Sequence, residues 1–106
     1  MGFVDMNSLK VREMLPGLRV KFVHTENMTF SYWNIDAGAV LPEHSHPHEQ
    51  VANMLEGEFE LTVNGEAKIM RPGDVCVIEP NARHSGRAIT NCRVVDVFYP
   101  VREDYR

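Results

Sequence analysis

The chain has 106 residues, 25% charged and 43% hydrophobic, and its formal net charge at pH 7 is −4. This length predicts one domain, residues 1–106, able to bury a core without staples. The acidic balance and the lack of a basic run argue against a nucleic acid or an anionic membrane as partner. No apolar stretch approaches the roughly 18 residues of a membrane-spanning helix, and the first residues do not resemble a signal peptide. We therefore expect a cytoplasmic protein.

The predicted elements that follow a mixed N-terminal segment (1–17) are almost all strands. Within that segment, residues 8–15 could form a short helical turn, which Pro16-Gly17 would end. Asn64-Gly65 is typical of a hairpin turn of type I′. This pattern predicts an all-β fold, a sandwich or barrel over residues 18–100 followed by a tail over 101–106. The expected strands cover residues 18–23, 28–35, 51–55, 59–63, 66–70, 75–78 and 93–99, which alternate or are rich in β-branched and aromatic residues.

Two histidines, His44 and His46, stand one residue apart. On a strand, side chains alternate between the two faces, so both imidazoles would point to the same side. Neutral imidazoles gathered on one face are ligands for a transition metal. A third histidine, His84, follows a tight turn that could bring it back over the same sheet. The spacing therefore predicts a metal site built on three histidines.

These histidines lie in two motifs that resemble those of the cupin superfamily. The first cupin motif has glycine, His-x-His, glutamate and glycine at set spacings, and the second has glycine, proline, glycine, histidine and asparagine. The resemblance spans about residues 35–100 and implies a single-domain, cupin-like β-barrel of the jelly-roll type. Asn81 replaces a glycine, which is tolerable because asparagine enters the left-handed region more readily than most residues. The first motif reads Gly38, His44, His46, Gln50 and Gly57, and the second reads Gly73, Glu79, Asn81, His84 and Ala88.

Carried over by position, the resemblance implies one divalent transition metal held by His44, His46, Gln50 and His84. Nickel, zinc, manganese, iron and cobalt all suit such a donor set. Because glutamine is neutral, the site would keep the full charge of the cation, and the cation would be a stronger Lewis acid and a better anchor for an anion. Glu49 is a rival ligand, although strand alternation would turn it away. His48 could contact the ligands or the substrate, or could be a surface residue.

A narrower resemblance rests on residues 44–50 together with the tail 96–105, which are similar to those of the KdgF group of small cupins. It implies metal-dependent ring opening and ketonisation of 4,5-unsaturated monouronates from pectin or alginate breakdown, to the linear keto form. Such a reaction needs a group that moves protons, and the candidate is Asp96. A carboxylate among apolar neighbours is costly unless it has a partner or a function, or unless it points outward to solvent.

Further residues are candidates for binding an anionic sugar substrate. Arg102 could hold the substrate carboxylate in a bidentate pair, or could be a solvated tail residue paired with Glu103 or Asp104. Phe98 and Trp33 could each line the pocket or fill the core, with the core favoured for Trp33. Arg83 could clamp an anion or be an ordinary surface charge.

Two other functions stay open at this point. The protein could be a non-catalytic cupin that binds a metal and a sugar acid, or a cupin dioxygenase or isomerase. Small barrels with exposed strand edges often pair with a second copy, so we expect a homodimer, with the apolar N-terminal segment as a candidate contact.

Overall fold

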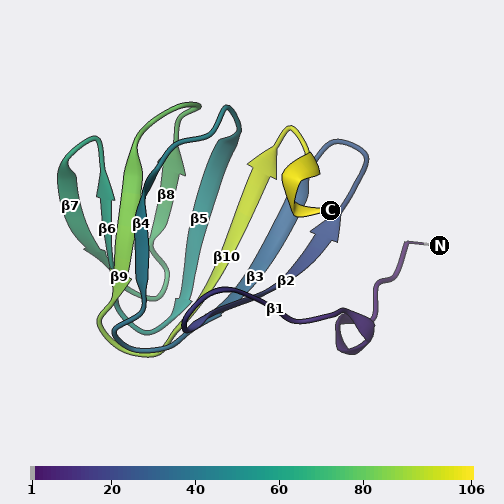
Figure 1. Cartoon of the computed structure of the whole chain (residues 1–106), viewed down its shortest axis with the longest axis horizontal. Coiled ribbons are helices and arrows are strands. Elements are labelled where there is room, and N and C mark those ends of the chain that lie inside the picture. Colours follow the sequence, from purple (N-terminus) through teal and green to yellow (C-terminus); the bar gives the residue numbers. More distant parts are fainter. Residues whose placement is uncertain (1) are drawn as a thin grey trace.

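The computed structural model describes residues 2–106, and Met1 lies outside the described residues. The chain forms two antiparallel β-sheets that face each other (Figure 1). The larger sheet has the strand order β1-β2-β3-β10-β5-β8, and the smaller has the order β4-β9-β6-β7. The strands are β1 (Arg12–Leu15), β2 (Leu18–His24), β3 (Thr29–Ile35), β4 (Val40–His44), β5 (Glu49–Glu56), β6 (Phe59–Val63), β7 (Glu66–Met70), β8 (Val75–Ile78), β9 (His84–Ala88) and β10 (Cys92–Tyr99).

This arrangement confirms the all-β, cupin-like jelly roll expected from the sequence, although the two sheets form a sandwich and are not joined into a closed barrel. The only helical segments among residues 2–106 are two short 3-10 turns, η1 (Met6–Ser8) and η2 (Glu103–Tyr105). Neither turn is long and apolar enough to cross a membrane.

The hydrophobic core lies between the sheets, because side chains alternate along each strand and the apolar ones face inward. On β5, for example, Ala52 and Met54 are buried, while Val51 and Asn53, which alternate with them, are only partly buried. Ile78 on β8 and Ala88 on β9 are fully buried. The inward row of β5 and β10 also carries polar side chains toward one end of the sandwich, and these build the site described below.

The N-terminal segment differs from expectation. The prediction of a helical turn over residues 8–15 was wrong, because Arg12–Leu15 forms β1 and pairs with β2. Pro16-Gly17 is the two-residue turn of this hairpin, and Gly17 takes the positive φ of 78° that the turn requires. Backbone pairing with a neighbouring strand overrides the weak local preference for a helical turn.

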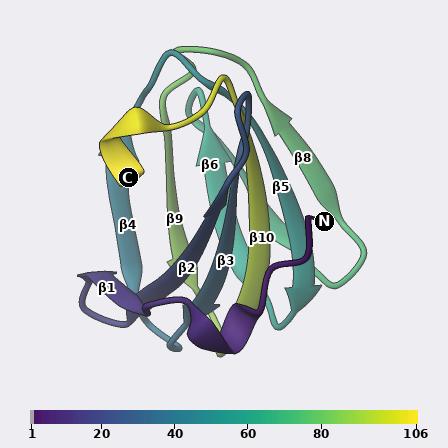
Figure 2. The same ribbon diagram turned by 90° about the vertical axis from the view of Figure 1, so that its right-hand side faces the viewer.

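Other local predictions were correct. Asn64 and Gly65 both have positive φ, 50° and 81°, and join β6 to β7 as expected for a type I′ hairpin. After β10 the chain turns back, and η2 lies at the end of the space between β10 and β4 (Figure 2). The C-terminal tail is therefore part of the wall of the sandwich interior.

Candidate metal centre

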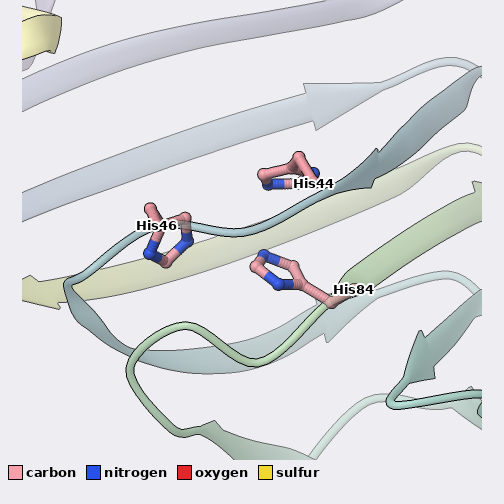
Figure 3. Close-up of side chains that lie close together, drawn as sticks. All are labelled: His44, His46 and His84. Atoms are coloured by element: carbon pink, nitrogen blue, oxygen red, sulfur yellow. The ribbon is translucent and has the colours of Figure 1, made fainter.

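Three histidines converge at one end of the sandwich (Figure 3). His44 is the last residue of β4 and pairs directly with His84, the first residue of β9, and their ring centroids are 4.2 Å apart. One ligand atom from each of His44, His46 and His84 can be chosen so that all lie within 4.8 Å of one another. The three-histidine cluster predicted from the sequence is thus present.

His46 reaches the cluster by a route that strand alternation did not predict. β4 ends at His44, so His46 lies in the loop that follows and not on the same strand. The backbone N–H of Asn81 donates to the carbonyl of His46 at 2.7 Å, which fixes this loop against the turn before β9. Asn81 has a φ of 67°, the left-handed conformation expected where the cupin motif has glycine.

Each imidazole of the cluster is oriented by a backbone carbonyl. The Nδ1 atoms of His44, His46 and His84 lie 2.9–3.0 Å from the carbonyls of Pro42, His48 and Ala82, respectively. A carbonyl can only accept, so Nδ1 carries the proton and donates, which leaves Nε2 of each neutral ring with a free lone pair. Such orientation of the second nitrogen is typical of histidines that bind metals.

Two observations show that the donor set fits a cation. Nε2 of His84 is buried without a hydrogen-bond partner, and the residue is 2% exposed. Nε2 of His46 lies 3.0 Å from Oε1 of Gln50. With Nδ1 of His46 protonated, both of these atoms are acceptors, so a hydrogen bond does not account for their approach. A divalent transition metal, with bonds of about 2.0–2.2 Å to nitrogen and oxygen, suits lone pairs arranged in this way.

The electrostatics of the cluster favour the neutral imidazoles that a metal requires. Burial, aided by the nearby positive charge of Arg102, lowers the pKa of His46 to about 4. Burial also lowers the pKa of His84. Both rings are therefore uncharged near neutral pH, the state in which Nε2 can act as a ligand.

Gln50 comes from the opposite sheet. It is the second residue of β5, is 7% exposed, and lies beside Phe98 of β10 and Ile78 of β8 in register. Glu49, the rival ligand, is exposed, as alternation predicted. The imidazole of His48 does not line the cavity that adjoins the three histidines. The backbone carbonyl of His48, however, orients the ring of His46.

A cavity of about 320 Å³ adjoins the histidines. Asp96 lines it, because this residue pairs in register with the buried residues Ser31 and Ala52 and so shares their inward face. Burial raises the pKa of Asp96 to about 7, although the nearby polar groups of Gln50 and Trp33 and the charge of Arg102 oppose the rise.

Arg102 also lines the cavity and is 6% exposed. The structure combines parts of both readings of this residue: it is buried, yet it is paired with Asp104. Nε and Nη2 donate to Oδ1 and Oδ2 of Asp104 at 3.0 and 2.7 Å. The third nitrogen, Nη1, is buried without a partner. Phe98 and Tyr105 lie against the guanidinium, with ring centroids 4.8 and 4.0 Å from its central carbon.

Of the remaining sequence candidates, two line the cavity and one does not. Phe98 is 3% exposed and lines the cavity, so it serves both the core and the site. Trp33 lines the cavity as well and packs against the core. Arg83 is exposed, pairs with Glu43 at 2.7 Å and is not among the residues that line the cavity.

Sequence reasoning missed three cavity-lining residues at the mouth of the site, Met14, Leu15 and Tyr105. The first two belong to β1, which the sequence had suggested was helical, and Tyr105 ends the tail 96–105 of the KdgF resemblance but was given no role there. Pro16-Gly17, read as the end of a helical turn, was the signal that could have indicated a hairpin turn.

The chain is similar to several known proteins. The chain is 33% identical over 70 residues to pectin degradation protein KdgF of Dickeya dadantii, covering 64% of each chain. It is 28% identical over 100 residues to H2HPP isomerase of Bacillus subtilis, covering 92% of this chain but 42% of that protein. The chain thus spans less than two thirds of each of these relatives. The solved structure of KdgF from Halomonas sp. superposes with a TM-score of 0.92 at 28% identity, covering 100% of this chain and 99% of that one.

The match to a described family covers most of the strands and every predicted metal ligand. The Cupin domain family matches residues 31–98, which include His44, His46, Gln50 and His84. The chain therefore belongs to the cupin family, as a small cupin that resembles KdgF.

Proposed function

We propose that this protein opens the ring of 4,5-unsaturated monouronates, released from pectin or alginate, and converts them to the linear keto form. The observation that carries the proposal is the shared cavity: three histidines, a glutamine, a carboxylate and a buried guanidinium line one space of about 320 Å³. Likeness to a pectin degradation protein supports the substrate class, and likeness to an isomerase supports a reaction without net oxidation.

The reaction rearranges bonds within one molecule. The anomeric hydroxyl loses a proton as the bond between the anomeric carbon and the ring oxygen breaks, which leaves an aldehyde. The electron pair of that bond stays on the ring oxygen, which becomes a ketone oxygen as the neighbouring double bond takes up a proton at its far carbon. One proton leaves and one arrives, so no oxidant or reductant is needed.

The residues that surround the cavity suit this chemistry. His44, His46, Gln50 and His84 would hold a divalent transition metal, which when bound supplies a Lewis acid for anionic oxygens of the substrate. We assign to Asp96 the removal of the hydroxyl proton and its delivery to carbon, because its carboxylate lines the cavity next to Gln50.

Two further residues would bind the substrate. Arg102 would attract the substrate carboxylate, and Phe98 would exclude water from the reacting atoms. Arg83, which the sequence also suggested for this role, does not line the cavity and is paired with Glu43, so it has no part in the proposal.

The test is a spectrophotometric assay with metal-loaded protein. Unsaturated galacturonate absorbs through its conjugated double bond, so turnover appears as a loss of absorbance. We expect Asp96→Asn to lower turnover by roughly 10²–10⁴-fold, while its metal content, measured by elemental analysis, stays equal to that of the wild type. Wild-type protein that binds galacturonate but leaves the unsaturated sugar unchanged would instead be a non-catalytic binding module. Turnover by Asp96→Asn at the wild-type rate would overturn the role of Asp96.

We also propose that the protein acts in the cytoplasm as a homodimer. The outermost strands of the sheets, β1 and β8 in one and β4 and β7 in the other, have an unpaired edge. Apolar side chains are exposed nearby, including Phe3 in the N-terminal segment and Val75 and Val77 on β8. Light scattering after size-exclusion chromatography tests this, and a monomer at micromolar concentration would count against it.

A further inference from the structure

The guanidinium of Arg102 is held more rigidly than binding of a carboxylate alone would require. The rings of Phe98 and Tyr105 both lie against it, and these two rings are nearly perpendicular to each other, at 79°. Its backbone N–H donates to Oγ1 of Thr29 at 2.8 Å, and Thr29 is fully buried. These contacts pack the guanidinium from two directions and limit its movement.

Asp104 limits the movement of the guanidinium further. Its two carboxylate oxygens accept from Nε and Nη2 of Arg102, the side edge of the guanidinium, in a bidentate pair. Hydrogen bonding to Arg102 lowers the pKa of Asp104, so the carboxylate is charged at neutral pH. Asp104 itself lies in η2, and η2 is tied to β1 by the hydrogen bond from Nη1 of Arg12 to the carbonyl of Tyr105 at 2.9 Å.

One donor of Arg102 is left over. Nη1 has no partner in the protein and is buried. A buried donor on a charged group that goes unpaired is unfavourable and rare in folded proteins, unless a ligand completes it. The side chain lines the same cavity as the histidines and Asp96. Nη1 is therefore the nitrogen through which an anion in the cavity can gain a new hydrogen bond.

We infer that Asp104 is a positioning residue, which occupies the Nε–Nη2 edge of Arg102 and thereby leaves Nη1 to receive the anionic group of the substrate. The inference rests on the proposed function and adds to it that the substrate does not use the side edge of Arg102. Asp104 acts through Arg102 alone and does not line the cavity.

The test compares Asp104→Asn with Glu103→Gln. Glu103 lies in the same turn and pairs only with the half-exposed Arg106, at 3.1 Å, so it is a matched control for loss of an acidic side chain from η2. For Asp104→Asn we expect KM for unsaturated galacturonate to rise about tenfold, as for one weakened charge-assisted hydrogen bond. We expect kcat to stay within about twofold, because an interaction made equally in ground and transition states changes KM alone. Glu103→Gln should match the wild type, and all three proteins should share one melting temperature.

A double-mutant cycle shows whether Asp104 acts through Arg102. In an Arg102→Gln background, Asp104→Asn should have no further effect on KM. The inference is overturned if Asp104→Asn leaves KM unchanged or lowers it, or if it raises KM equally in the Arg102→Gln background. A lower KM would mean that Asp104 competes with the substrate for Arg102.

Binding of saturated D-galacturonate, measured by calorimetry, separates this inference from the proposed function. If wild-type protein binds D-galacturonate without turning over the unsaturated sugar, the proposed reaction fails alone, and Asp104→Asn should still weaken binding about tenfold. If wild-type protein does not bind D-galacturonate at millimolar concentration, the inference fails too, since it needs an anion on Arg102.

Discussion

Replacing Thr29 with valine tests how the fold holds the C-terminal tail over the site. Valine has nearly the shape of threonine, but it removes the Oγ1 that accepts the backbone N–H of Arg102 at 2.8 Å and that also lies 2.8 Å from Nδ1 of the partly exposed His24. Thr29 is fully buried, so water does not replace the lost acceptor without rearrangement. A buried donor left without a partner costs about 1–3 kcal/mol. At about 4–8 °C per kcal/mol for a domain of this size, a loss near 2 kcal/mol lowers the melting temperature by about 8–16 °C.

The assay is urea or thermal unfolding of metal-free protein, followed by kinetics on the metal-loaded form. Thr29→Ser keeps the hydroxyl and loses only a methyl group, so it should cost about 1 kcal/mol and leave KM close to the wild type. Thr29→Val should also raise KM, because the backbone at Arg102 loses its anchor. If the valine protein proves as stable as the wild type while the serine protein does not, the hydroxyl is not what secures the tail.

Four further outcomes can be checked. His84→Ala removes one donor and should weaken metal affinity by at least about 100-fold in a chelator competition, whereas unchanged affinity would exclude His84 as a ligand. Gln50→Glu adds a negative charge beside the metal, so it should tighten metal binding and slow turnover, and an equal kcat would show that neutrality at this position is unimportant. Stripping the metal with a chelator should destabilise the fold by about 3–4 kcal/mol relative to protein held at 100–1,000 times the Kd, and identical melting curves would contradict binding at this site. Asn81→Ala should cost about 1–2 kcal/mol at a φ of 67°, while Asn81→Gly should cost little, so equal losses would refute the conformational reason for asparagine here.

Much of the fold could be predicted because local chemistry and tertiary structure agree. The hairpin at Asn64-Gly65 needed only two residues that accept positive φ, and the strands on either side alternate clearly. β1 could not be predicted in the same way. Three of its four side chains are exposed, so it carries no buried face, and only its pairing with β2 makes it a strand.

The candidate metal centre could be predicted from the sequence more fully than the side of the cavity where the substrate would bind. His44, His46, Gln50 and His84 sit at motif spacings, although the path of His46 through a loop was not foreseen. The environment of Arg102 depends on contacts made by Phe98, Tyr105 and Asp104 at once. No spacing rule indicates which edge of a guanidinium a neighbouring carboxylate will occupy. The pairing of Asp104 with one edge of Arg102 is therefore visible only in the three-dimensional structure.

The placement of the four candidate metal donors has a consequence for how the molecule opens. His44 and His84 belong to the smaller sheet, whereas Gln50 belongs to the larger one. A cation bound by all of them would cross-link the two layers at the end where polar side chains line the interior. Local opening of β4, an edge strand of the smaller sheet, would then have to break metal bonds first, so amide hydrogen exchange in Val40–His44 should report directly on metal occupancy.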